Sequence, residues 1–292
     1  MEYENTPISS NIEDRRGMNG GGGGFAMGGG GLGIGAIIVI FAISYFTGIS
    51  PQVLMGGADM IARNSQSYTQ PARTGPAADA NDPMRNFLAH VLGQTEEVWK
   101  TVLPQQAGVR YTPATLVLYD GATRSGCGGA RSAMGPFYCP IDKKVYLDTS
   151  FFRDMKTKYG GGGEFAYAYV VAHEIGHHVQ DLLGILDKVD AAKERVSQTQ
   201  ANALSVRVEL QADCLAGVWA ANANQKWRIL EQGDVERAIA TAQAIGDDRL
   251  QEAARGYAVP DSFTHGSSAQ RTKWLTTGLK SGEVDSCDTF SR

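Results

Sequence analysis

This chain of 292 residues has few of the features by which proteins bind nucleic acids or nucleotides. Its formal net charge is −4 and no stripe of lysine and arginine is present, which argues against a nucleic-acid partner. The glycine run at 160–163 lacks the lysine and the serine or threonine of a phosphate-binding loop, and no dinucleotide-binding fingerprint occurs. We therefore expect neither nucleic acid nor a nucleotide cofactor among its partners.

Cysteine is scarce as well. The four cysteines include no C-x-x-C pair, and their spacings do not suit a zinc ion held by cysteines. Cys127 and Cys139 bracket a loop rich in glycine, serine and alanine, which favours a local disulfide, and Cys214 and Cys287 would then pair with each other. Disulfides indicate an exported protein, whereas four reduced thiols in a cytosolic protein are the alternative.

Long hydrophobic runs are limited to one, at residues 32–49. These 18 residues are uncharged and mostly apolar, and as a helix they would span about 27 Å, just enough for the core of a bilayer. A buried helix is the alternative, but the run stands alone before a polar segment. We expect a transmembrane helix over residues 32–50, which makes the lipid bilayer a partner of the chain.

The segments on either side of this run have no hydrophobic pattern. Residues 1–31 are polar and then rich in glycine, which predicts a disordered leader. Residues 51–80 are rich in alanine, glycine, glutamine, serine and threonine, which predicts a flexible linker. The folded domain is expected over residues 81–292, and about 210 residues can bury a substantial core as one unit.

The basic residues around the hydrophobic run indicate its orientation. Arg15 and Arg16 precede the run, and no further basic residue follows until Arg63. The positive-inside tendency then places a cytoplasmic leader before an exported domain, in a single-pass membrane protein. A cleaved signal peptide would have a shorter apolar core and a small-x-small cleavage site, so we expect an uncleaved anchor.

The domain at 81–292 has the pattern of an α+β fold that is mostly helical with a small β-sheet. Asp82 and Pro83 form an N-cap followed by proline, which predicts a helix that runs to about Val102. Alternation and β-branched residues predict strands at 114–119 and 137–147. Further helices are expected at 151–159, 164–183, 187–224, 234–254 and 268–280.

The sequence His173-Glu174-Ile175-Gly176-His177 is the strongest indication of chemistry. Side chains four residues apart share a helix face, so both imidazoles can bind one metal ion, with Glu174 beside them to accept a proton from water. Chance is the alternative explanation, but the apolar surroundings of this helix make unpartnered histidines costly. His178 lies about 100° around the helix from His177, so we expect a packing or surface role for it.

A catalytic zinc needs a third protein ligand and one open position. Glu209 is the candidate, because it lies on a largely apolar helix and shares a face with Asp213, four residues later. We expect Asp213 to accept the second ring N–H of one histidine and so to fix its tautomer. A solvated stripe of carboxylates is the alternative, which the apolar neighbours of Glu209 disfavour.

These residues resemble the gluzincin metallopeptidases, in which two helices supply His, His and Glu to one zinc ion. His265 and Arg271, six residues apart, are similar to the His…Arg element of the membrane-associated gluzincins. The whole chain resembles the bacterial family of neutral zinc metallopeptidases. That resemblance rests on four further segments, which are Ser10–Gly17, Ser125–Gly128, Gly135–Pro140 and Val170–Gln180.

The resemblance implies a zincin-like fold, one Zn²⁺ per chain and a peptide or protein substrate in the cell envelope. It also makes the membrane of the expected anchor the bacterial inner membrane, with the domain on its periplasmic or extracellular side. Glu174 would act as the general base, and His265, with Arg271 and Tyr257 as weaker candidates, would stabilise the charge that develops on the scissile carbonyl. Arg271 is expected to pair with Glu209 or Asp213. The strand that ends at 146–148 is the expected sheet edge for an extended peptide.

Two other functions fit the same residues. One is a non-catalytic, membrane-tethered metal-binding scaffold, although a structural zinc usually has four protein ligands and no need of Glu174. The other is an iron-dependent oxidoreductase with a His/His/Glu site. Both alternatives are compatible with the spacing of the ligands.

Overall fold

A computed structural model describes residues 1–17, 82–158 and 162–291. Residues 1–16 belong to the same compact unit as the domain that begins near residue 78. The expected transmembrane helix at 32–50 and the expected linker at 51–80 lie outside the described residues. Among the helices of the described ranges, none is both long and apolar enough to cross a membrane.

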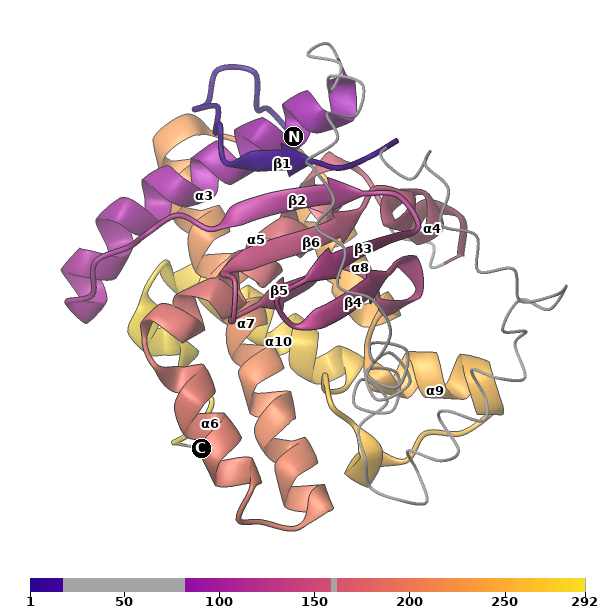
Figure 1. Ribbon diagram of the computed structural model, residues 1–292. Helices are drawn as coiled ribbons and strands as arrows, with labels where there is room; N and C mark the ends of the chain where they lie inside the picture. The colour runs from indigo at the N-terminus through magenta and orange to yellow at the C-terminus, as the bar shows by residue number, and fades with distance from the viewer. Residues whose placement is uncertain (18–81, 159–161, 292) are drawn as a thin grey trace, which may run out of the picture. The chain divides into compact units, whose positions relative to one another are not determined.

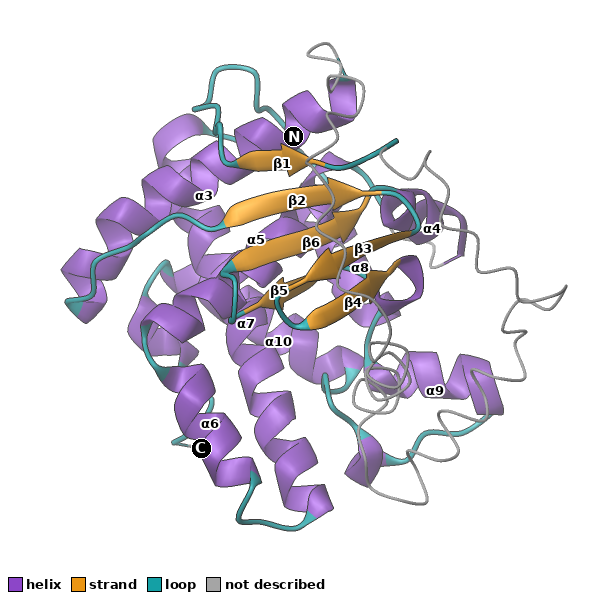
Figure 2. Ribbon diagram, in the orientation of Figure 1, coloured by secondary structure: helices purple, strands orange, loops and turns teal. Residues whose placement is uncertain are grey.

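The central sheet has four strands in the order β1-β2-β6-β5 (Figures 1 and 2). Their bounds are Ile12–Asp14 (β1), Thr115–Tyr119 (β2), Phe137–Cys139 (β5) and Lys144–Asp148 (β6). β1, β2 and β6 run parallel, whereas β5 pairs antiparallel with β6. The single strand predicted at 137–147 is therefore a hairpin of two strands.

This strand order corrects the prediction of the substrate-binding edge. The strand that ends at 146–148 is β6, which is hydrogen-bonded on both sides, to β2 and to β5, and so has no free edge. The edge nearest the helix of the His-Glu-x-x-His motif is β5, which contacts that helix. Asp148 serves as a cap instead, because its carboxylate accepts the backbone N–H of Ser150 at 2.8 Å, at the start of the next helix.

The two faces of the sheet are covered differently because successive side chains point to opposite faces. Leu116, Leu118, Val145 and Leu147 face the helices and join the main hydrophobic core. The side chains on the other face form a second, smaller core with a β-hairpin, β3 (Ala122–Ser125) and β4 (Gly128–Arg131); its members are Val117, Tyr119, Ala130, Cys139 and Tyr146.

Helices make up most of the rest of the described chain. The α-helices are α3 (Pro83–Ala107), α4 (Ser150–Lys158), α5 (Glu164–Leu182), α6 (Ile185–Lys193), α7 (Gln198–Trp227), α8 (Asp234–Ala244), α9 (Asp247–Arg255) and α10 (Ser268–Ser281). Short 3-10 helices are η1 (Ser132–Met134), η2 (Pro260–Ser262) and η3 (Val284–Cys287). The predicted α+β class, mostly helical with a small sheet, is confirmed.

Capping residues and one glycine explain where the helices begin and where two of the predicted helices are each divided into two. Asp82 caps α3 by accepting the N–H of Met84 at 2.9 Å, with proline in the first turn as predicted. The helix predicted at 187–224 is two helices, because Ser197 begins α7 with a reciprocal capping box. The helix predicted at 234–254 is likewise divided, because Gly246 has an extended backbone between α8 and α9.

The prediction of a disordered leader over residues 1–31 is wrong for residues 1–17. Ser9 and Asn11 both donate to the buried carboxylate of Glu96 on α3, at 2.6 and 2.7 Å, and β1 adds to the free edge of β2. A polar, pattern-poor segment is ordered here because its hydrogen-bonding groups are satisfied by the domain. Residues 18–31 lie outside the described part of the chain.

Candidate metal centre

The metal centre is built where α5 crosses α7. The two helices approach closely at Gly176, where an added Cβ would lie 3.0 Å from the carbonyl oxygen of Ala212. Glycine is needed there because a larger side chain would push the helices apart. This close approach brings His173 and His177 of α5 opposite Glu209 of α7, as the sequence predicted.

The three candidate ligands converge on one point. The Nε2 atom of His173 lies 3.2 Å from one carboxylate oxygen of Glu209, and the Nε2 atom of His177 lies 3.6 Å from the other. Two donors each about 2.0–2.1 Å from a tetrahedral metal ion lie about 3.3 Å apart, which matches these separations. Three protein donors of this type leave one coordination position open. The residues present therefore fit a catalytic zinc ion.

Asp213 orients the first histidine. Its Oδ1 atom lies 2.9 Å from Nδ1 of His173, so Nδ1 donates to Asp213 and Nε2 is the nitrogen turned towards Glu209, where a metal ion would displace the proton that Nε2 carries. Tyr169 donates to the same oxygen at 2.6 Å, and Arg271 donates to both oxygens of Asp213. The expected hydrogen bond of Asp213 to a histidine is present, and of the two partners expected for Arg271 the structure selects Asp213.

The electrostatics of the site favour a cation. Burial alone would raise the pKa of Asp213, but the guanidinium of Arg271 holds that pKa far below its ordinary value. Burial alone would lower the pKa of His173, but Asp213 and then Glu209 raise it to about 10. Both carboxylates are therefore ionised, and their field stabilises positive charge between the helices.

A pair of glutamines orients the second histidine, which the sequence analysis missed. Nδ1 of His177 lies 2.8 Å from Oε1 of Gln180, one turn further along α5. Gln180 is itself bonded to Gln211 of α7 at 2.9 Å. The i,i+3 spacing of His177 and Gln180 on one helix was the available signal. Gln211 could not have been found in this way, because it comes from a different helix.

Glu174 lies beside the ligands and is held by none of them. Its side chain is 7% exposed, and within the described residues no hydrogen bond restrains its carboxylate. It lies within electrostatic range of His177. The carboxylate oxygens are not among the fully buried, unsatisfied atoms of the described residues, so they keep contact with the solvent that enters the site. This is the arrangement expected of a general base.

His265 is brought towards the centre by the loop between α9 and α10. Its Nδ1 lies 3.3 Å from Oδ1 of Asp247, and Oδ2 of Asp247 accepts the backbone N–H groups of Thr264, His265 and Gly266 at 2.6–3.0 Å. Burial would lower the pKa of His265, but Asp247 and then Glu209 raise it. The ring is 53% exposed, so it stands at the solvent side of the site.

The structure also places Tyr257 and His178, for which the sequence predicted a weak catalytic role and a packing or surface role. Tyr257 is 60% exposed, and its ring lies against the guanidinium of Arg255 rather than in the site. The structure therefore gives its predicted catalytic role no support. His178 is fully buried, and bonds the carbonyl of Thr112 at 2.6 Å and the hydroxyl of Tyr138 at 3.0 Å. It is a packing histidine, as predicted.

Both expected disulfides are present. Cys127 is bonded to Cys139, which fixes the β3–β4 turn to the end of β5, and Cys214 is bonded to Cys287. Cys214 follows Asp213 directly on α7, so this second disulfide joins the C-terminal segment to the wall of the metal centre. The four cysteines of the chain are all used in these two bonds.

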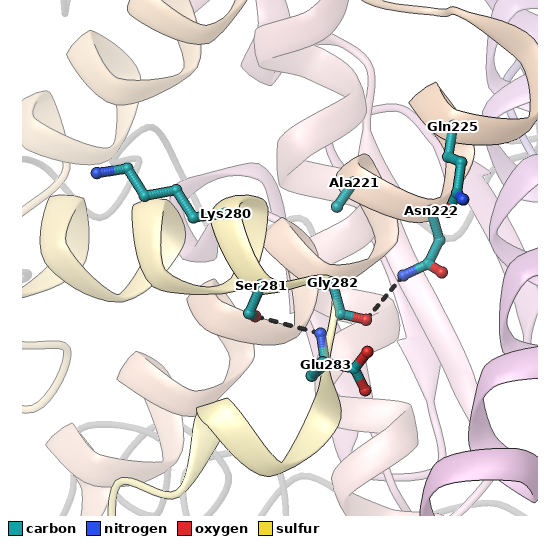
Figure 3. Close-up of a pocket in the computed structure, with 7 residues that line it drawn as sticks. All are labelled: Ala221, Asn222, Gln225, Lys280, Ser281, Gly282 and Glu283. Atoms are coloured by element: carbon teal, nitrogen blue, oxygen red, sulfur yellow. Dashed lines mark hydrogen bonds between the residues drawn. The ribbon is translucent and has the colours of Figure 1, made fainter.

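A small polar hollow occurs elsewhere, between the ends of α7 and α10 (Figure 3). Its lining is partly tied together, since Asn222 donates to the carbonyl of Gly282 at 3.0 Å and Ser281 accepts the N–H of Glu283 at 3.2 Å. Asn222 lies 13 residues beyond Glu209 on α7, which places it about 20 Å from the metal centre. It is not part of the site.

The fold and the site together define a class: an α+β protein in which a His-Glu-x-x-His helix and a glutamate from a second helix bring together three donors that could hold a metal ion. The chain belongs to the family described as "Putative neutral zinc metallopeptidase", whose model matches residues 1–290. The predicted family resemblance is thus confirmed, and it includes the N-terminal segment that packs on the domain.

Several relatives have similar sequences over much or all of this length. "Uncharacterized protein YpfJ" of Escherichia coli strain K12 is 44% identical over 296 residues, covering 100% of this chain and 99% of that protein. "Uncharacterized protein Rv2575" of Mycobacterium tuberculosis strain H37Rv is 43% identical over 229 residues, covering 75% of this chain and 74% of that protein. No solved structure matches this chain.

Proposed function

We propose that the protein is a zinc-dependent peptidase that hydrolyses peptide bonds in proteins of the bacterial envelope. The observation that carries this proposal is the combination of three converging ligands with an unrestrained, buried Glu174 beside them. A purely structural metal site has no use for that fourth group. The family to which the chain belongs supports the same reading.

The chain's own residues then have distinct tasks. A zinc ion bound by His173, His177 and Glu209 supplies Lewis-acid chemistry, polarising a peptide carbonyl and making water easier to deprotonate. Glu174 takes the proton from the attacking water and delivers it to the leaving amine nitrogen. Asp213 keeps His173 in the tautomer that presents Nε2.

His265 is proposed to donate a hydrogen bond to the carbonyl oxygen as negative charge develops there. Its Nδ1 faces Asp247, so Nε2 is the nitrogen that is free to point towards substrate. The raised pKa of His265 favours the protonated ring, which has a donor at both nitrogens. Asp247 positions this ring both directly and by holding the backbone of its loop.

The free edge of β5 is the proposed binding place for the substrate backbone. Among the described strands, β5 is hydrogen-bonded to β6 alone, and Tyr138 at its centre contacts α5 through His178 and Asp181. An extended peptide can add to such an edge as a further strand. This replaces β6, which the sequence had favoured and which is interior.

We place the active domain on the exported side of the bacterial inner membrane, held at the lipid bilayer through residues 32–50. The support for export is the pair of disulfides, which persist in oxidising compartments. The support for the membrane is the uncharged run at 32–49.

The test is cleavage of an unfolded protein by the zinc-loaded wild type and by Glu174→Gln. We expect Glu174→Gln to bind zinc normally and to lower kcat by about 10²–10⁴-fold, while Glu194→Gln, an exposed change at the end of α6, leaves kcat unchanged. Cleavage that survives Glu174→Gln would remove the general-base assignment.

Two further outcomes address the other functions. A wild-type protein that binds zinc and cleaves no peptide would favour the membrane-tethered scaffold. Purified protein that contains iron instead of zinc would favour the oxidoreductase, since the same His/His/Glu donors accept either metal.

A further inference from the structure

The hydrogen bonds around His177 have a fixed direction. Gln180 has one amide group with a donor end and an acceptor end, and its Nε2 donates to the carbonyl of Val208 at 2.8 Å and to Oε1 of Gln211 at 2.9 Å. If the amide of Gln180 were turned over, its oxygen would face the carbonyl oxygen of Val208 and Oε1 of Gln211. The amide of Gln180 is therefore held with Oε1 towards His177, so that Nδ1 of His177 must be the donor.

The direction of Gln211 is fixed in the same manner. Its Nε2 donates to the backbone carbonyl of Cys287 at 3.1 Å, which leaves Oε1 to accept from Gln180. Both glutamines are buried, at 0% and 8% exposure, so water does not compete for these groups. The hydrogen bonds therefore all point the same way: His177 donates to Gln180, Gln180 donates to Gln211, and Gln211 donates to the backbone carbonyl of Cys287.

Cys287, whose carbonyl ends this chain of hydrogen bonds, is held by a covalent bond. Cys287 is bonded to Cys214 on α7, and Cys214 directly follows Asp213, the partner of the other histidine. One disulfide therefore joins the residue next to Asp213, which bonds His173, to the residue whose carbonyl holds Gln211, which bonds His177 through Gln180.

We propose that Gln180 and Gln211 are positioning residues of the metal centre, which set the tautomer and direction of His177 and link them to the Cys214–Cys287 disulfide. With Nδ1 committed as a donor, Nε2 of His177 keeps its lone pair and points at Glu209. This inference rests on the metal site of the proposed function, but not on its peptidase activity, because its effect is on metal binding.

The test uses the metal-free protein and measures zinc affinity by competition with a chelator, together with the visible absorption spectrum of the cobalt(II)-loaded protein. Gln180→Met removes the acceptor for Nδ1 while keeping the length of the side chain. We expect about 10–100-fold weaker zinc binding and an altered cobalt spectrum. Gln211→Met leaves Gln180 with the carbonyl of Val208, so a smaller loss is expected.

Gln94→Met is the matched control, because Gln94 is a fully buried glutamine on α3 that bonds Thr6 and not the metal centre. It should lower thermal stability without changing zinc affinity. Wild-type zinc affinity and an unchanged cobalt spectrum in both Gln180→Met and Gln211→Met would overturn the proposal.

The disulfide is tested by the double variant Cys214→Ser, Cys287→Ser against the double variant Cys127→Ser, Cys139→Ser. We expect zinc affinity to fall only in the first, with the secondary structure of each checked by circular dichroism. Equal affinities in the two folded variants would break the link between the disulfide and the metal centre.

A second inference rests on the N-terminal segment, defined as residues 1–16, and is independent of the metal centre. The segment is fastened at several points, among them Glu96, to which Ser9 and Asn11 donate, and Gly93, where an added Cβ would overlap the backbone of Pro7. Arg16 pairs with Asp82 at 2.5 Å, so the two ends that flank residues 17–81 meet at one place.

Arg15 and Arg16, the basic residues that predicted the orientation in the membrane, both form ion pairs within this fold. Arg15 pairs with Glu13 at 2.8 Å, and Arg16 pairs with Asp14 as well as Asp82. We propose that the N-terminal segment lies on the same side of the membrane as the catalytic domain. A single crossing between residues 17 and 82 would put β1 and β2 on opposite sides, which their pairing forbids. This proposal therefore replaces the single-pass arrangement with a cytoplasmic leader that the sequence predicted.

Thiol labelling tests this in the full-length protein, because all four native cysteines are in disulfides. A cysteine is introduced at exposed Glu4 and, for reference, at Asp190 on α6, whose side chain is 74% exposed. A membrane-impermeant maleimide applied to spheroplasts should label the two positions equally.

Equal protection of both positions until lysis would also support a shared side, while contradicting the exported location of the proposed function. Labelling of Asp190→Cys before lysis, with Glu4→Cys labelled only afterwards, would overturn the inference and restore a single crossing with a cytoplasmic N-terminal segment.

Discussion

Arg271 of α10 donates two hydrogen bonds to Asp213 of α7, with Nε 2.8 Å from Oδ2 and Nη2 2.9 Å from Oδ1. Both side chains are buried, and the same carboxylate holds Nδ1 of His173. The pair therefore does two things at once. It neutralises a buried negative charge, and it fixes the residue that orients a metal ligand.

Replacing Arg271 by methionine should be strongly destabilising, because it leaves the charge of Asp213 buried without its partner. We expect a loss of about 3–5 kcal/mol in the free energy of unfolding, measured with denaturant. Lys100→Ala breaks an exposed pair with Glu97 and should cost at most about 1 kcal/mol. Similar losses for the two variants would show that the buried pair contributes no more than a surface one.

The loop that carries His265 should affect turnover more than binding. His265→Ala is expected to lower kcat by about 10²–10³-fold, the range for loss of one donor to a developing oxyanion. Asp247→Asn should produce part of that loss with little change in KM, because it acts through His265. Tyr257→Phe is the control and should leave both constants unchanged; a large loss of kcat there would reinstate Tyr257.

The N-terminal segment should loosen in acid. The hydrogen bond from Arg15 lowers the pKa of Glu13 to about 2, with Lys144 adding to the effect and burial opposing it. Since this folded-state pKa lies below the ordinary value of 4.5, the stabilisation is present above about pH 4.5 and is lost as the pH falls towards 2.

Thermal unfolding midpoints between pH 7 and pH 2 measure this effect. Glu13→Gln should lower the midpoint at neutral pH and converge on the wild type at about pH 2, whereas exposed Glu252→Gln should follow the wild type throughout. A constant offset for Glu13→Gln over the whole range would mean that its ionisation is not the cause.

Gly278 should tolerate no side chain. It lies on α10 where that helix crosses α7, and an added Cβ would overlap the carbonyl oxygen of Cys214. Gly278→Ala is expected to cost at least about 1–3 kcal/mol of unfolding free energy, because the helices must separate. Lys280→Ala, exposed on the same helix, should be close to neutral, and an equally small effect of Gly278→Ala would contradict this packing.

The metal centre was predictable because its key residues follow the geometry of single helices. His173 and His177 are four residues apart, as are Glu209 and Asp213, so each pair had to share a face. The partner of Arg271 was left open between Glu209 and Asp213, and the structure selects Asp213. The local disulfide Cys127–Cys139 followed from the loop between its cysteines, which left Cys214 and Cys287 to pair with each other. Local rules were sufficient wherever one element carried the whole signal.

The remaining features depend on contacts between elements far apart in the sequence. Gln211 completes the environment of His177 from another helix, and Asp247 was concealed in a segment that reads as an ordinary acidic helix start. The interior position of β2 depends on β1, a strand of three residues without hydrophobic alternation. No periodicity in the sequence announces pairing of that kind.

β1 also sets an order of events in folding. Its pairing with β2 closes a loop of about 100 residues, at a chain-entropy cost of about 4 kcal/mol. The contacts that offset this cost, three strand pairs and the bonds to Glu96 and Asp82, form only with the folded domain. The strand should therefore join late, after the sheet and helices have condensed, and should open first in the native state. Each such opening bares the backbone of β2, so the N-terminal segment protects the domain from joining strands with a neighbouring molecule.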